Sequence, residues 1–296
     1  MIAEISDIAS DLQEKMMIFS ISLSVGLSIL VIAWRQGFFR VMRVTSYPAI
    51  RGIDVFKGFA FFLLAEIFVV PVFIAVLLKS AEIDFKQLIL LQPEMKGWLN
   101  LMIMTGGFIA IFFSYFSLSL IQRHQLWNQT STPWWTHLAI GILGWVVSYP
   151  LVLALSQGLS ISLWYVFQQP FVEQVAVQNV RRSMENPLLF ALTSLSVVIV
   201  VPLTEEFLFR GLLQSWLKRK FGTAIGAILF SSFIFACFHY SNHHGIMNIE
   251  LLPSLFVLSC MLGYLFERQQ SLWASLGLHG FFNFMSLLLI YQGGIL

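Results

Sequence analysis

Long uncharged stretches recur along this chain, and their length limits the possible folds more than any other feature. The segment LLFALTSLSVVIVVP, which ends at Pro202, contains no charged residue. A helix needs about 20 apolar residues to cross the hydrocarbon layer of a bilayer. Only 11% of the residues are charged and 58% are hydrophobic, whereas a soluble domain is about 25% charged. The sequence therefore predicts an all-α, polytopic membrane protein.

The apolar pattern predicts about eight transmembrane helices in one bundle. They are expected near residues 17–34, 56–78, 98–122, 134–156, 187–216, 223–240, 250–267 and 272–291. The fifth is too long for a perpendicular crossing, so it is expected to tilt or to emerge at one end. The acidic N-terminus, with Ile2, Ile5, Ile8 and Leu12 on one face, predicts a short surface helix, and residues 170–183 predict a second interfacial helix.

Polar residues within the spans divide the chain near residue 186. Residues 1–185 hold four plain spans with a surface helix and loops, and residues 186–296 hold nearly all the intramembrane polar side chains. Lys and Arg gather in the loops after the first and fifth spans, so the positive-inside rule predicts both termini outside the cytoplasm. Cys237 and Cys260 lie in apolar segments and are expected to be small buried residues.

The stretch LTEEFLFRGLL, residues 203–213, places three charges inside the fifth span. Each such charge costs about 2.5–3.5 kcal/mol in the middle of a bilayer, so it is expected to face the interior of the bundle. Residues four apart share a helix face, and Glu206 and Arg210 are therefore expected to form an ion pair, which alone could be a structural tie. Glu205 points about 100° away and has no partner nearby in sequence. A carboxylate withdrawn from water is a stronger base, which suits a general base.

Two other spans carry polar residues at membrane depth. His239 lies near the end of the sixth span, and the rise of about 1.5 Å per residue places it at the same depth as Glu205. His279 and Asn283 share one face of the eighth span, and both can donate hydrogen bonds. Each could simply tie helices together. As a group they predict hydrolysis of an amide, in which Glu205 and His239 activate water and His279 and Asn283 stabilise an oxyanion.

Three motifs occur in one order along the second half. EEFLFRGLL fits Glu-Glu-x-x-x-Arg-Gly-x-Leu, FACFH fits Phe-x-x-x-His, and HGFFN fits His-x-x-x-Asn. Through them, residues 186–291 resemble the CAAX prenyl endopeptidase and bacteriocin-processing (CPBP, or Abi) family of intramembrane glutamic proteases.

The resemblance implies an eight-helix endopeptidase that needs no metal and no cofactor. It assigns Glu205 and His239 to water activation, His279 and Asn283 to the oxyanion hole, and Glu206 and Arg210 to support of the site. We expect a membrane-associated or lipidated peptide as substrate, no nucleic-acid partner, and a multi-pass protein of a bacterial plasma membrane. Glu66 receives no role from the family; it could be an interior tie or a further acid of the site.

Three other functions stay open on the sequence alone. Two glutamates and two histidines could bind zinc, although no His-Glu-x-x-His motif is present, and activity that survives strong chelators would exclude this. The same family includes non-catalytic immunity and scaffold proteins, which a Glu205→Ala comparison would separate from proteases. A transporter would predict inverted repeats between the halves, and none is visible in the sequence.

Overall fold

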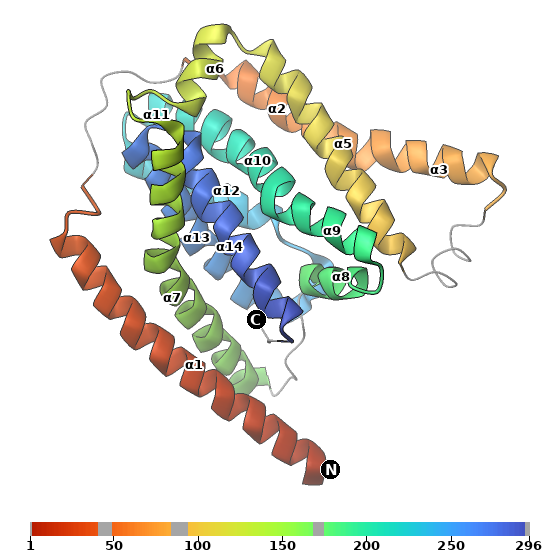
Figure 1. Ribbon diagram of the computed structural model, residues 1–296, viewed down its shortest axis with the longest axis vertical. Coiled ribbons are helices and arrows are strands. Elements are labelled where there is room, and N and C mark those ends of the chain that lie inside the picture. Colours follow the sequence, from red (N-terminus) through yellow and green to blue (C-terminus); the bar gives the residue numbers. More distant parts are fainter. Residues whose placement is uncertain (1, 41–48, 84–93, 168–174, 294–296) are drawn as a thin grey trace.

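The computed structural model describes residues 2–40, 49–83, 94–167 and 175–293, with side chains from residue 11 in the first segment and from residue 176 in the last (Figure 1). Seven helical segments in these ranges are long and apolar enough to cross a membrane. They are Asp11–Arg35, Gly52–Ser80, Met95–Ser117, Trp134–Phe167, Pro187–Phe221, Asn242–Gln269 and Leu272–Tyr291. The predicted all-α polytopic bundle is confirmed, and the chain is a multi-pass integral membrane protein.

The helical elements follow one another along the chain. In order they are α1 (Ile2–Arg35), α2 (Gly52–Leu64), η1 (Ala65–Val69), α3 (Val70–Ser80), α5 (Met95–Ser117), α6 (Leu120–Trp127), α7 (Trp134–Phe167), α8 (Val175–Ser183), α9 (Pro187–Leu195), η2 (Ser196–Val200), α10 (Val201–Glu206), η3 (Phe207–Gln214), α11 (Ser215–Phe221), α12 (Ala224–Phe238), η4 (Asn242–Met247), α13 (Asn248–Gln269) and α14 (Leu272–Tyr291). Three of them, η1, η2 and η3, are π-helical.

The predicted sixth span is shorter in the structure than the sequence suggested. Its helix, α12, has 15 residues, which corresponds to about 22 Å of rise, whereas the hydrocarbon core of a bilayer is about 30 Å thick. It begins at the cap residue Thr223, directly after Gly222, whose φ of 70° ends α11. Because α12 stops early, its last residues lie at membrane depth and not at the far surface.

The two predicted surface helices are found in part. Helix α1 runs without a break from Ile2 to Arg35, so no bend separates the expected surface helix from the first span. The side chains of Ile2, Ile5 and Ile8 lie outside the described residues. Helix α8 covers the end of the second predicted surface helix, and residues 170–174 lie outside the described part of the chain.

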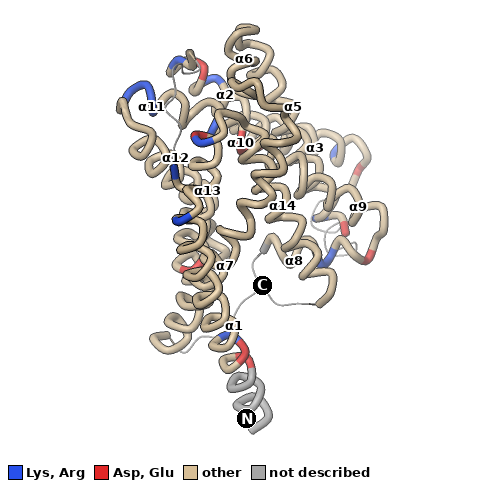
Figure 2. Tube along the Cα trace, turned by 60° about the vertical axis from the view of Figure 1, so that its left-hand side comes forward, with Lys and Arg blue, Asp and Glu red and all other residues tan. Residues whose placement is uncertain are grey.

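Charges gather at the two ends of the bundle: Lys and Arg dominate one end, and the other carries acidic and basic residues together (Figure 2). The end that carries α11 and the start of α2 is basic, and its acidic residues, Asp54 and Glu267, form ion pairs with Arg51 and Lys218. Described cations at this basic end are Arg35, Arg40, Arg51, Lys57, Arg123, Lys218, Arg219, Lys220 and Arg268. The opposite end, where α1 begins and α14 ends, carries most described acids and is called the acidic end below.

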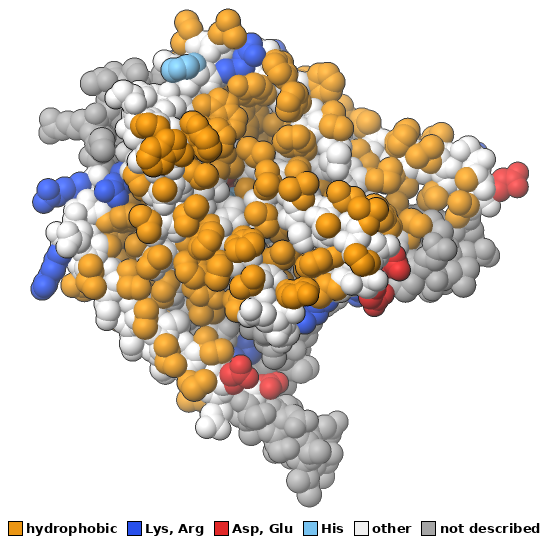
Figure 3. Space-filling view, viewed as in Figure 1, with side chains coloured by type: hydrophobic (Ala, Val, Ile, Leu, Met, Phe, Trp, Pro, Cys, Tyr) orange, Lys and Arg blue, Asp and Glu red, His pale blue; other side chains and the backbone are white. Residues whose placement is uncertain are grey.

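Large apolar side chains cover the outer surface between these ends (Figure 3). Trp34, Phe113 and Ile225 are among the most exposed, as expected for residues that face lipid. Cys237 also proves exposed on α12, so the expectation that it is buried is wrong, while Cys260 is half-buried and both thiols are free. An apolar run does not reveal which of its residues face lipid, since both environments suit a small hydrophobic side chain.

The fifth span, from α9 to α11, is one long helix that contains two π-helical segments, η2 and η3. Asn186 caps its start by accepting hydrogen bonds from two backbone amides, and Pro187 follows in the first turn. The π-helical η2 precedes Pro202, and the π-helical η3 carries Arg210. Single π turns are rare and often occur at functional sites. They rotate the side chains that follow them relative to a uniform α-helix.

A row of buried polar side chains joins this span to α13. Arg210 donates to the backbone oxygen and the hydroxyl of Ser259, at 3.0 and 2.7 Å. One turn on, Gln214 donates to the backbone oxygen of Gly263 at 3.0 Å and to Glu267 at 3.1 Å. Lys218 then forms an ion pair with Glu267. We call this row, together with Glu206, the polar ladder.

Candidate active site

Glu206 and Arg210 form the ion pair that their spacing predicted. Arg210 Nε and Glu206 Oε2 lie 3.2 Å apart, and the two side chains are 1% and 0% exposed. These two atoms do not form a hydrogen bond, so the contact is electrostatic. The Nη2 group of the guanidinium donates its hydrogen bonds to Ser259. Glu206 also bonds His279, through Oε1 and Nδ1 at 2.8 Å. The ion pair is therefore the most deeply buried part of a larger polar cluster.

Glu205 faces away from this pair and toward two imidazoles, as expected from its position on the helix. Its Oε1 lies 3.6 Å from His239 Nε2, and its Oε2 lies 3.6 Å from His279 Nε2. Glu205 is 19% exposed and His239 is 31% exposed. One carboxylate thus joins two histidines from different helices, at the open side of the cluster.

The ring orientation of His239 is set by its own helix. His239 is the C-cap residue directly after α12, and its Nδ1 lies 2.9 Å from the backbone oxygen of Phe235. A carbonyl oxygen only accepts hydrogen bonds, so Nδ1 carries the hydrogen. In the neutral ring this leaves Nε2 as a hydrogen-bond acceptor directed at Glu205. The early end of α12 places this nitrogen within the membrane and on the side of the acidic end.

Asn283 lies on α14 one turn beyond His279, but its amide is already engaged. Asn283 Nδ2 donates to the backbone oxygen of Val197 at 2.9 Å. Pro202 has no N–H with which to bond the carbonyls one turn before it, in η2. Gly280 lets α14 come close here, because a Cβ at this position would lie 2.9 Å from the oxygen of Val198. Asn283 therefore satisfies a carbonyl near the proline, and no described contact joins it to Glu205.

Phe235, the first residue of the Phe-x-x-x-His motif, is a member of the cluster to which the sequence assigned no role. It is 1% exposed. Its ring centre lies 4.8 Å from the Arg210 guanidinium, 4.7 Å from the His239 ring and 6.3 Å from the His279 ring. The first residue of the Phe-x-x-x-His motif is thus the apolar wall between the ion pair and both histidines, which its position in the motif could have indicated.

Comparison with known proteins finds a family that resembles the second half of the chain. Residues 187–285 match the family model described as type II CAAX prenyl endopeptidase Rce1-like. This region is therefore similar to the CAAX prenyl endopeptidase (CPBP) family. The match confirms the family that the three motifs indicated, and it contains every predicted site residue from Glu205 to Asn283. No curated protein and no solved structure matches the chain.

At the level of the family, the chain is therefore related to membrane endopeptidases of the CAAX type. Its bilayer setting, which the apolar helices establish, fits a substrate that is itself associated with the membrane. The matched region begins at α9, close to the predicted division at residue 186. The division into two parts stays a prediction.

Glu66 reaches the cluster from outside the CPBP region. It lies in η1, in the second crossing segment, and it interacts electrostatically with Glu205. A Cβ on Gly107 of α5 would lie 2.9 Å from Glu66 Oε1, so the absence of a side chain at this glycine gives the carboxyl its place. The sequence left open whether Glu66 is a helix tie or a further acid of the site, and its proximity to Glu205 favours the second interpretation.

The remaining titratable residues near the end of α12 have different surroundings. His243 is exposed in η4, whereas His244 is half-buried and its ring nitrogens have no hydrogen-bond partner among the described residues. Within the described ranges, no group of three or more His, Cys, Asp or Glu residues has the arrangement of a metal site.

Proposed function

We propose that the chain is an intramembrane endopeptidase in which Glu205 and His239 activate a water molecule. The observation that carries this is the position of Glu205 between two imidazole nitrogens, at 3.6 Å from each. Glu205 Oε1 and His239 Nε2 are both acceptors in the state described above, and a water can donate one hydrogen to each. Its lone pairs then remain free to attack a carbonyl carbon.

The proposed reaction needs only the groups in the cluster. The water oxygen bonds to the carbonyl carbon of the peptide, and its proton passes to Glu205. The tetrahedral intermediate carries a negative oxygen, which hydrogen-bond donors fixed in a low-dielectric site stabilise. The C–N bond then breaks, and the proton held by Glu205 moves to the leaving amine.

His279 is suited to donate to that oxygen when its ring carries two hydrogens. Nδ1 then donates to Glu206 at 2.8 Å, and Nε2 presents the other N–H to the open side. The charges of Glu205, Glu206, Arg210 and this imidazolium sum to zero, which a site inside a membrane favours. We assign Asn283 to the oxyanion hole through the amide hydrogen that it does not use on Val197.

The substrate class follows from the setting of the site. We propose a membrane-tethered peptide, for example one that carries a lipid near the bond to be cleaved, in a bacterial plasma membrane. The basic end of the bundle is assigned to the cytoplasm by the positive-inside rule. The site would then be reached from the opposite, acidic end.

The test compares wild type with Glu205→Gln in cleavage of a panel of lipidated and membrane-tethered peptides. Loss of the general base is expected to lower the rate by about 10²–10⁴-fold, with an unchanged unfolding midpoint because Glu205 has no direct hydrogen bond to lose among the described residues. Glu82→Gln, a charge loss at an exposed position of the acidic end, is the matched control and should cleave normally. Equal cleavage by Glu205→Gln and wild type would refute the proposal, and cleavage that strong chelators abolish would replace it with a zinc mechanism.

A further inference from the structure

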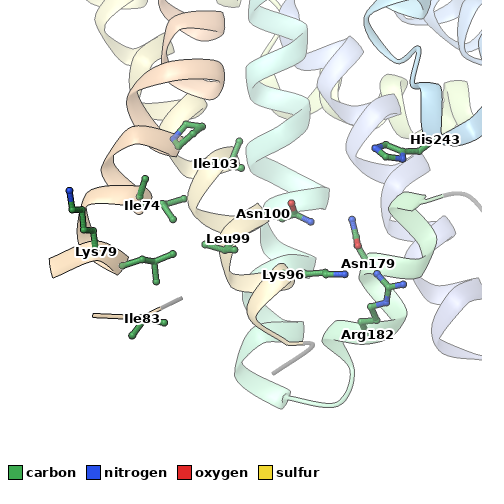
Figure 4. Close-up of a pocket in the computed structure, with 13 residues that line it drawn as sticks. Ile74, Lys79, Ile83, Lys96, Leu99, Asn100, Ile103, Asn179, Arg182 and His243 are labelled. Carbon is green, nitrogen blue, oxygen red and sulfur yellow. The ribbon is translucent and has the colours of Figure 1, made fainter. Parts of the chain in front are cut away.

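A cavity separate from the Glu205 cluster opens near the acidic end of the bundle (Figure 4). Its volume is about 900 Å³, within the range of about 300–1,000 Å³ that is usual for small-molecule sites. One wall comes from α3 and the opposite wall from α5, α8 and η4. We propose that this cavity binds one anionic membrane phospholipid, with its phosphate at the rim and an acyl chain along the apolar walls.

Much of the cavity lining is apolar, which is the surface that a hydrocarbon chain requires. Pro71, Ile74 and Leu78 line it from α3, and Leu99 and Ile103 line it from α5. Apolar walls hold water poorly, and an empty hollow forfeits the dispersion contacts of its lining atoms. Since exposed Ile83 lies at the rim, surrounding lipid can reach the cavity. An acyl chain is the occupant that the bilayer supplies.

The rim adds three cations on three different elements. Lys79 lies in the last turn of α3, Arg182 in the last turn of α8, and Lys96 in the first turn of α5. Lys79 and Arg182 also suit the negative ends of their helix dipoles, but Lys96 sits where that dipole disfavours a cation. Asn100 and Asn179 add amide donors between them.

The acidic end carries both signs of charge, with described acids such as Glu82 and Glu94 and described cations such as Lys15 and Arg181. Lys79, Lys96 and Arg182 differ from the other cations there because all three line one apolar hollow. A phosphate diester at the headgroup depth, with its chain directed toward the membrane centre, matches both parts of the lining.

Several residues that line the cavity lie within about one helical turn of members of the candidate active site. Pro71 is little more than one turn beyond Glu66, and Ile103 is one turn before Gly107, the residue against which Glu66 lies. His243, on the opposite wall, is four residues beyond His239. A bound phospholipid would thus contact the same helices that carry Glu66 and Gly107 and the segment that follows His239. The inference does not depend on proteolysis, since lipid binding can be measured without any substrate.

The experiment measures lipid binding to the purified full-length protein by native mass spectrometry. Phosphatidylglycerol is compared with phosphatidylcholine of the same acyl chains. Each cation near a membrane surface contributes about 1 kcal/mol, or about fivefold, so three should give wild type a preference for phosphatidylglycerol on the order of 10²-fold. Equal binding of the two lipids by wild type would overturn the proposal.

Two triple variants separate the site from general charge. Lys79→Gln, Lys96→Gln and Arg182→Gln together should reduce the preference to near onefold. The matched control, with Arg35→Gln, Arg40→Gln and Lys220→Gln at the basic end, removes the same charge and should keep the preference. An equal loss of preference in both variants would overturn the proposal, because it would show that net charge and not the rim selects the lipid.

A third variant tests the apolar wall. Leu99→Trp fills the cavity without changing its charge, and it should lower the affinity for both lipids by at least tenfold while the thermal unfolding midpoint stays near that of wild type. Unchanged lipid affinity in this variant would refute binding within the cavity. Displacement of phosphatidylglycerol by a soluble acidic peptide would also overturn the proposal and would assign the cavity to a peptide.

Discussion

Arg210 offers the sharpest test of the cluster's architecture, because it is fully buried and has partners on two helices. The Arg210→Met variant keeps an apolar stem of similar length beside Phe235 but removes the charge that Glu206 faces at 3.2 Å. Breaking a buried ion pair by removing one partner costs about 3–5 kcal/mol, since the other charge is left uncompensated. The two bonds to Ser259 are lost in the same change.

We expect the lower end of this range, about 3 kcal/mol, because an unfolded chain within a membrane also finds polar partners. The double variant Glu206→Gln with Arg210→Met removes the orphaned charge while the amide can still contact His279. It should therefore be more stable than the sum of the single variants predicts, with a coupling of about 1–3 kcal/mol.

The assay is reversible unfolding by SDS in mixed micelles, followed by circular dichroism. Lys220→Met, an exposed substitution on the same long helix, is the control and should change the free energy of unfolding by less than about 0.5 kcal/mol. The reasoning is refuted if Arg210→Met loses less than about 1 kcal/mol, or if the two single variants are additive.

Three further substitutions test particular contacts. Gly141→Ala would place a Cβ 2.1 Å from the backbone oxygen of Ala274, so α7 and α14 must separate at a cost of at least about 1–3 kcal/mol; an SDS midpoint like that of wild type would contradict this close approach. Asn283→Leu leaves the oxygen of Val197 without its donor and should lower the free energy of unfolding by about 1–3 kcal/mol, besides lowering peptide cleavage; a loss of cleavage alone would mean that Asn283 has no structural role. Phe235→Leu removes the wall between both histidines and the ion pair, and it should lower the cleavage rate at least tenfold at saturating substrate; an unchanged rate would show that the ring does not position them.

Part of the site could be predicted from helix geometry alone. The four-residue spacing of Glu206 and Arg210 predicted their ion pair, and the separate direction of Glu205 is confirmed by its contacts with His239 and His279. These predictions succeed because neighbours on one helix face depend only on the local period. Depth counted along two apolar helices likewise brought Glu205 and His239 together.

Other features depend on contacts that the local period does not contain. The bond from Asn283 to Val197 arises because Pro202 removes a donor on a different helix. The position of Glu66 depends on the missing side chain of Gly107. The π-helical turns leave the apolar pattern unbroken, so neither composition nor periodicity reveals them. The end of α12 at Phe238 lies only two residues before the end that the sequence predicted for this span.

The polar ladder has a consequence for the biosynthesis of the chain. Arg210 and Gln214 find their partners 49 residues later in the sequence, on α13. While α13 is still being synthesised, the fifth span emerges with polar side chains whose hydrogen-bond acceptors on α13 do not yet exist. We expect this span to stay beside the insertion machinery until α13 arrives, so that a chain truncated before Ser259 would be held there and degraded. The two helices would then enter the bilayer as one unit, and the active-site helix would be released only when its partner is complete.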